Sequence, residues 1–192
     1  MRIQKHLQLI HDLTFRNTSE KNMSLETVYD RMIRFMKQDL CGAYELRIGT
    51  DCQVHTDHTK FITGVMLIRK GKGTWAAYRQ VIVPMKIHSI KEKLTRETSY
   101  SGEIALFFDQ ERRNEMEDLI LPHIYRGASF DAYIDIDAGT DELKNKTAPY
   151  VAEMVRWVES MGMKAKIKPE SISASCYANR HTKKPFRASA AQ

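Results

Sequence analysis

Two β-type runs in this sequence end in carboxylates. Residues 44–54 deliver one of them, Asp51, beside Gly49 and small polar residues. Residues 130–137 carry three more, and the period-two alternation of a strand puts them on one face. These are Asp131, Asp135 and Asp137. Because Mg²⁺ prefers oxygen ligands, carboxylates at the ends of two strands predict a divalent-metal site on a sheet.

The pattern of the rest of the chain predicts how these strands are arranged. Apolar alternation and glycine-bearing turns predict five strands, over residues 44–54, 61–69, 74–83, 130–137 and 163–168. Helical spacing of apolar residues predicts helices over 24–38, 88–116 (with a bend at Gly102), 149–161 and 170–185. A three-stranded antiparallel meander followed by β-α-β units is typical of an α/β ribonuclease H-like fold, a five-stranded mixed sheet flanked by helices.

This fold would bring the two aspartate-bearing strands together. In it the first and fourth strands are neighbours, so Asp51 and Asp135 are expected to face each other. The helix between these strands offers three glutamates to complete the set. They are Glu92, Glu97 and Glu103. Carboxylates holding a pair of Mg²⁺ or Mn²⁺ ions about 4 Å apart can activate water and stabilise the leaving oxygen of a phosphodiester.

Short motifs, in the same order along the chain, resemble those of one family. They are Asn-Thr at 17–18, Met-Ser-Leu at 23–25, Ile-Gly-Thr-Asp-Cys-Gln-Val at 48–54, Gly-Lys-Gly at 71–73, Leu-Thr-Arg-Glu at 94–97, Ile-Asp-Ile at 134–136, Lys-Pro at 168–169 and Ala-Ser-Cys-Tyr-Ala-Asn-Arg-His-Thr-Lys at 174–183. Together they resemble the YkuK-type family of predicted ribonuclease H-like nucleases.

The resemblance implies a set of site residues. Asp51, Glu97 and Asp135 match the family's catalytic, metal-binding carboxylates. The wider set of candidate ligands is Asp51, Glu97, Asp135, Asp137, Asn179 and His181. Asn179 stands where the family pattern has Asp, which removes one negative charge from a second metal site. His181 substitutes for it, or the site holds one metal, or this member has lost activity.

The charge is distributed in a way that suits a polyanion. The formal net charge is +6, and residues 161–192 contain seven Lys and Arg against one acid. Residues 58–91 contain seven more and no acid. These basic segments predict contacts with nucleic acid. The residues expected to make them are Lys70, Lys72, Arg79, Lys168, Arg180 and Lys183. A solvated basic face with a loose tail is the alternative interpretation.

Composition narrows the class of protein. With 192 residues and 42% hydrophobic content, we expect one domain over 21–185, an N-terminal extension over 1–20 and a basic, disordered tail over 186–192. No apolar run is long enough to span a membrane, and residues 1–6 lack the apolar core of a signal peptide. Three cysteines without a CxxC pair favour a reduced, cytoplasmic protein.

Two functions therefore remain open. The first is a metal-dependent nuclease that hydrolyses RNA, DNA or a hybrid with Mg²⁺ or Mn²⁺. The second is a nucleic-acid-binding module that keeps the fold but is catalytically impaired by Asn179. An actin-like phosphotransferase is disfavoured, because such proteins need two domains of this kind and this chain supplies one.

Overall fold

The chain forms a five-stranded mixed sheet, seen here in a computed structural model that describes residues 14–171 and 177–181. The strands are β1 (Ala43–Val54), β2 (Thr59–Arg69), β3 (Gly73–Val83), β4 (Ser129–Asp135) and β5 (Lys164–Lys166). Their order is β3-β2-β1-β4-β5; β1, β2 and β3 pair antiparallel, while β4 pairs parallel with both β1 and β5. The predicted meander and parallel strands are confirmed.

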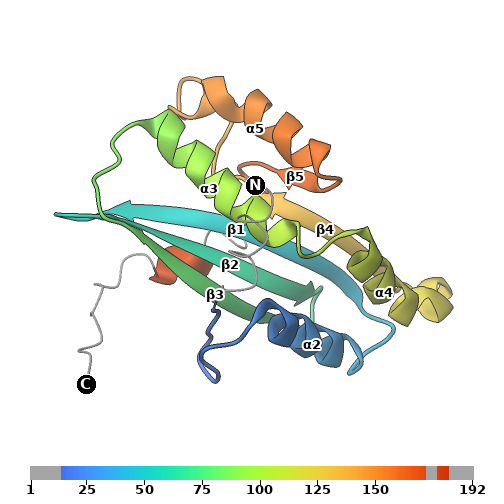
Figure 1. The fold of residues 1–192 in the computed structure, drawn as a ribbon. Coiled ribbons are helices and arrows are strands. Elements are labelled where there is room, and N and C mark those ends of the chain that lie inside the picture. Colours follow the sequence, from blue (N-terminus) through green and yellow to red (C-terminus); the bar gives the residue numbers. More distant parts are fainter. Residues whose placement is uncertain (1–13, 172–176, 182–192) are drawn as a thin grey trace, which may run out of the picture.

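Helices cover both faces of this sheet. They are α2 (Leu25–Met36), α3 (Ile90–Ala105), α4 (Gln110–Ile120), the 3₁₀ helix η1 (Leu121–Arg126), α5 (Ala148–Ser160) and a short helical segment over 177–181. Figure 1 shows α3 and α5 side by side above the sheet, with the red segment 177–181 on the opposite side. We call the side that α3 and α5 cover the helical face, and the other the second face.

The first predicted helix forms for the reasons that its sequence gives. Ser24 is the N-cap, and its side chain accepts a hydrogen bond from the Thr27 amide at 3.1 Å. Leu25, Val28 and Met32 recur at helical spacing and are buried. The helix therefore packs its apolar side into the core.

The prediction of one helix over 88–116 with a bend at Gly102 is wrong in one respect. Helix α3 ends at Ala105, and a second helix follows it. Asp109 caps a new helix, α4, by accepting a hydrogen bond from the Arg112 amide at 3.0 Å. Gly102 lies inside α3, where a Cβ atom would come within 2.4 Å of the Trp157 ring. The glycine therefore serves the close contact between α3 and α5.

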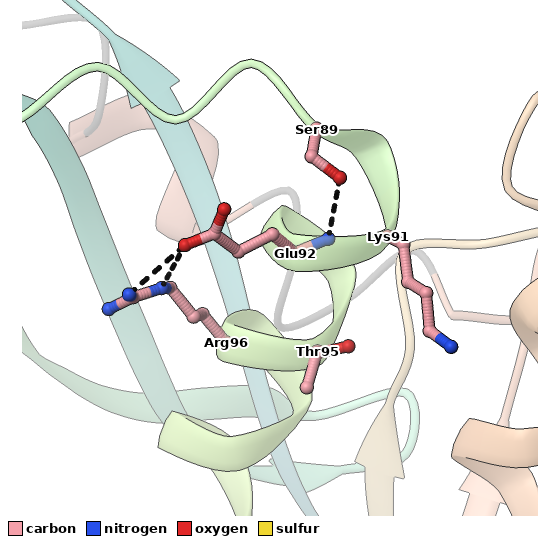
Figure 2. A pocket seen from close by; sticks show the side chains of 5 residues that line it. All are labelled: Ser89, Lys91, Glu92, Thr95 and Arg96. Carbon is pink, nitrogen blue, oxygen red and sulfur yellow. Dashed lines mark hydrogen bonds and ion pairs between the residues drawn. The ribbon is translucent and has the colours of Figure 1, made fainter.

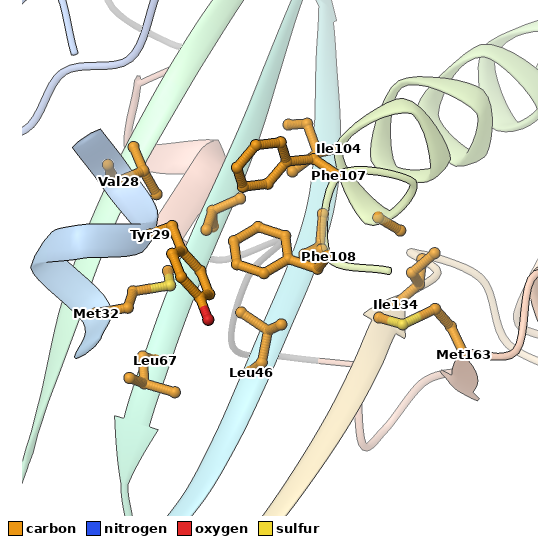
Figure 3. Packing of buried hydrophobic residues seen from close by; sticks show 14 of the residues in the cluster. Val28, Tyr29, Met32, Leu46, Leu67, Ile104, Phe107, Phe108, Ile134 and Met163 are labelled. Carbon is orange, nitrogen blue, oxygen red and sulfur yellow. The ribbon is translucent and has the colours of Figure 1, made fainter. Parts of the chain in front are cut away.

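The core lies between the helices and the helical face of the sheet. Alternate residues of β1, among them Leu46 and Ile48, point into it and are fully buried. In Figure 3, Phe107 and Phe108 fill the space between α2 and β1, and the Tyr29 ring lies at 6.3 Å from that of Phe108. Because Phe107 and Phe108 follow the C-terminal end of α3, their packing fixes that helix against β1.

The second face is polar and has a flat centre. The strand register aligns Tyr78, Gly64, Gly49 and Asp135 in one row across β3, β2, β1 and β4. Paired residues of neighbouring strands point to the same side of a sheet, so this row belongs to one face. The two glycines leave its middle without side chains.

Both ends of the described chain meet this sheet at β3. Phe15 is fully buried, and Arg16 exchanges backbone hydrogen bonds with Tyr78 at 2.9 Å, so these residues of the predicted extension pair with the sheet edge. At the other end, 177–181 is the described part of the helix predicted over 170–185. Residues 172–176, 182–185 and the predicted tail lie outside the described residues. No helix in the described part is long and apolar enough to cross a membrane.

Candidate metal centre

The centre is located where β4 ends and β1 continues. The last pair between these strands is Gly49 with Asp135, and β1 extends five residues further, to Val54. Asp51 therefore lies two residues beyond the pair, and so does Asp137 on the other chain segment. The expectation that Asp51 faces Asp135 is wrong by two residues, because Asp135 pairs with Gly49 and the pairing ends there.

Helix α3 brings a third carboxylate to this place. Its Ser101 hydroxyl lies 2.8 Å from that of Thr50, and both are buried. One helical turn earlier, Glu97 accepts a hydrogen bond from the thiol of Cys52. Thr50 and Cys52 both point to the helical face, so these contacts fix Glu97 over the end of β1.

The electrostatics link Glu97 to the two aspartates. Burial raises the pKa of Glu97 to about 8, the negative charges of Asp51 and Asp137 add to this rise, and the Cys52 hydrogen bond and Lys93 oppose it. Burial also raises the pKa of the Cys52 thiol, with Glu97 and Asp51 adding to that rise. The negative charges of Asp51 and Asp137 therefore favour the protonated form of Glu97.

The other two glutamates of α3 are occupied elsewhere. In Figure 2, Glu92 and Arg96 face each other in a pocket at the start of the helix, below the Ser89 cap; the Arg96 Nε–Glu92 Oε1 distance is 3.1 Å. Glu103 pairs with Arg79 at 2.7 Å. Of the three candidates, Glu97 is the one whose pKa the charges of Asp51 and Asp137 raise.

Asp135 lies in a different setting. It is 2% exposed, and one of its oxygens accepts hydrogen bonds from Nε and Nη2 of Arg47 at 2.9 and 2.6 Å. Arg47 is itself 4% exposed and donates from Nη1 to Glu45 at 3.3 Å. The positive charge of a buried guanidinium therefore balances the charge of Asp135.

Among the described residues, no group of three or more His, Cys, Asp and Glu side chains is arranged to hold a metal ion as it stands. The donors present nevertheless fit a hard divalent cation, since Asp51, Glu97 and Asp137 offer only carboxylate oxygens. The Cys52 thiol donates to Glu97, and the Lys168 ammonium pairs with Asp137 at 3.0 Å.

The C-terminal helical segment approaches this region from the second face. The His181 ring stacks on Tyr78 with centroids 3.8 Å apart, and the Tyr177 ring lies 6.1 Å from Tyr78. Ala178 is fully buried, and Asn179 is partly buried. The stacking engages the His181 ring at β3, which leaves Asn179 as the candidate ligand of this segment that can face β1.

Comparison with known proteins agrees with the fold. The profile of the family described as Ribonuclease H-like matches residues 26–183. The chain belongs to the ribonuclease H-like family. It is 41% identical over 169 residues to a protein of Bacillus subtilis (strain 168) described as "Uncharacterized protein YkuK", covering 88% of this chain and 96% of that protein. No solved structure matches it.

The residues predicted to contact nucleic acid lie in different parts of this ribonuclease H-like chain. Lys168 is on the surface and pairs with Asp137, and Arg180 is exposed on the helical segment 177–181. Lys70 and Lys72 are also exposed, but their hairpin lies at the other end of β1, about 23 Å from Asp51. Arg79 is 3% exposed and paired with Glu103, so the prediction that it contacts nucleic acid is wrong. Lys183 lies outside the described residues.

Sequence reasoning missed three cations that define the ribonuclease H-like centre. Lys93 lies near Glu97, and Arg47 and Lys60 are buried on the second face. A signal for the last two existed: each is a charged residue within a strand, on the face opposite the apolar residues. Their partners could not be read from the sequence, because they lie far along the chain.

Proposed function

We propose that this protein is a divalent-metal-dependent nuclease whose centre is formed by Asp51, Glu97 and Asp137. The observation that supports the proposal is that Asp51 and Asp137 both act electrostatically on Glu97, a buried glutamate of α3, in a ribonuclease H-like chain. Like charges gathered in a partly buried place destabilise the fold, so such a cluster is expected to serve a cation.

Each residue has a distinct part in this proposal. Asp51 and Asp137 hold the cation from the two strand ends, and Glu97 from α3. Asn179 adds a neutral oxygen from the second face. Asp135 is reassigned from ligand to partner of Arg47, because the guanidinium already balances its charge. Glu97 must release the proton that its raised pKa keeps bound near neutral pH.

Magnesium or manganese suits this donor set. When bound, such a cation lowers the pKa of water and neutralises charge on the oxygens of a phosphodiester. The protein's own contribution is to hold the strand, and Lys93, Lys168 and Arg180 are the cations near enough to contact its phosphates. We propose RNA, DNA or a hybrid as the substrate class.

A second candidate, a nucleic-acid-binding module without catalysis, is favoured by one observation. The described residues contain no three-ligand group that is already arranged for a metal, and Asn179 brings no charge. This candidate predicts salt-dependent nucleic-acid binding without metal-dependent turnover.

Cleavage of labelled single strands and hybrids, with and without Mn²⁺ or Mg²⁺, separates the two. Wild type should cleave with metal, and Asp51→Asn should be slower by about 100-fold or more, since even residues that only support ligands contribute 10–100-fold. Asp57→Asn is the matched control, because Asp57 lies on the hairpin after β1 with its side chain 84% exposed. Equal rates in wild type and Asp51→Asn would exclude the proposed centre. Binding without cleavage by wild type would favour the module.

A further inference from the structure

Two buried cations on the second face hold the C-terminal segment. Arg47 in β1 is 4% exposed, and its Nη2 donates to the Glu170 carbonyl at 2.7 Å. Lys60 in β2 is 2% exposed, and its Nζ donates to the His181 carbonyl at 2.7 Å. The two contacts lie at opposite ends of the segment 170–181. The sheet thus binds the backbone at Glu170 and at His181, and we call these two hydrogen bonds the grip.

Such cations are costly to bury and are rarely found buried without partners. The charge of Arg47 is balanced by Asp135 and Glu45. Lys60 donates to the carbonyl of His181, the last described residue of the helical segment. Both side chains therefore connect the sheet to the backbone of one particular segment, whatever the side chains of that segment are.

The geometry of the helix indicates what this grip positions. Successive residues of an α-helix are rotated by about 100°. Tyr177 and His181 face Tyr78 on β3, and Ala178, one step round, is buried. One further step turns Asn179 away from β3, toward β1, while Arg180 is exposed.

The strand register places the same grip beside the proposed centre. Lys60 pairs with Gln53, and Ile62 pairs with Asp51. Lys60 is thus the diagonal neighbour of Asp51 on the second face, at a typical distance of about 7–8 Å. The helical segment, whose His181 carbonyl accepts from Lys60, is therefore anchored near Asp51.

We propose that Arg47 and Lys60 are positioning residues that fix the C-terminal segment so that Asn179 faces the carboxylates. The grip consists of the hydrogen bonds from Arg47 to the Glu170 carbonyl and from Lys60 to the His181 carbonyl. Its role at the centre rests on the proposed function, because it acts through Asn179 as a ligand. The fourth ligand is thereby supplied by a segment that the sheet holds in place from the second face.

Hydrogen exchange of the full chain tests the grip without any activity. In Lys60→Met, the backbone amides of 178–181 should exchange about tenfold or more faster than in wild type, while those of β1 remain protected. Lys60→Arg keeps the charge and a donor and should restore most of the protection. Lys86→Met, at an exposed lysine, is the control. Unchanged exchange in Lys60→Met would overturn the grip; should this variant fail to fold, Lys60→Gln takes its place with the same expectation.

A double-mutant cycle on the Mn²⁺ dissociation constant tests the role at the centre. Lys60→Met and Asn179→Ala should each weaken Mn²⁺ binding about tenfold. Because Lys60 acts through Asn179, the double variant should also be about tenfold weaker, whereas independent effects would multiply to about 100-fold and overturn the positioning role. Absence of Mn²⁺ binding by wild type would overturn the proposed function and this role with it, while the exchange experiment would still decide on the grip.

Discussion

Asp135 and Asp137 are two residues apart at the end of β4, yet their surroundings are opposite. Asp135 is 2% exposed and shares a buried ion pair with Arg47 at 2.6 Å. Asp137 is partly exposed and contributes to the raised pKa of Glu97. The first carboxylate has a cation of its own inside the fold. The second adds to a group of negative charges that the fold only partly balances.

The two aspartates show that the role of a carboxylate depends on the groups that pair with it. The guanidinium of Arg47 donates two hydrogen bonds, from Nε and Nη2, to one oxygen of Asp135, and both side chains are buried. Lys168 meets Asp137 at the surface, where both side chains are 46% and 31% exposed and an ion pair stabilises little. A structural role thus follows for Asp135, whereas Asp137 has only a surface partner and is where a bound cation would add more.

Asparagine substitutions of Asp135 and Asp137 should show the difference between the two positions most clearly. In the absence of divalent metal, Asp135→Asn should lower the free energy of unfolding by about 3–5 kcal/mol, because it leaves Arg47 buried with a charge no longer balanced. Asp137→Asn should change it by less than about 1 kcal/mol. Urea denaturation with a chelator present measures both, and equal losses would contradict the distinction.

The pH dependence of stability should sharpen the same contrast. The pKa of Glu97 is raised from 4.5 to about 8 by burial and by Asp51 and Asp137. Between these values the folded state binds a proton that the unfolded state has lost, so this residue's contribution to stability falls as the pH rises from about 5 to 8. Glu97→Gln should remove that part of the slope. Denaturation of both proteins at pH 5.5 and 8, with chelator, checks it; parallel slopes would contradict it.

The smallest effect is expected at the surface cation beside Asp137. Lys168→Met should leave the free energy of unfolding within about 1 kcal/mol of wild type. It should weaken nucleic-acid binding and reduce the slope of log affinity against log salt by about one, as expected when one phosphate contact is lost. Lys144→Met, at a side chain that is 82% exposed, is the control. An unchanged salt slope would exclude a phosphate contact at Lys168.

Local pattern was sufficient to predict most of the fold. The alternation in 44–54 and the glycines of the 70–73 turn predict a hairpin that the structure contains, and Ser24 predicts the start of α2. These features depend on neighbours in sequence. The break between α3 and α4 was missed, because Gly102 was taken as a bend and its actual role depends on Trp157, far along the chain.

The centre could be predicted only in part, for the same reason. Asp51 follows from its place on a strand, and Glu97 from family resemblance. The choice between Asp135 and Asp137 depends on the register of β1 against β4, which alternation cannot give, since both residues share a face. The partner of Asp135 was also out of reach, because Arg47 is 88 residues away in the chain.

Titration of Mn²⁺ by calorimetry tests the central claim most directly, with wild type, Asp137→Asn and Asp131→Asn compared at one pH. Asp131 lies on the same strand, paired at the surface with Lys164, and serves as the matched control. We predict that wild type and Asp131→Asn bind Mn²⁺ alike and that Asp137→Asn binds about tenfold to 100-fold more weakly. Equal binding by Asp137→Asn and wild type, or no binding by wild type, would contradict a cation centre at Asp51, Glu97 and Asp137.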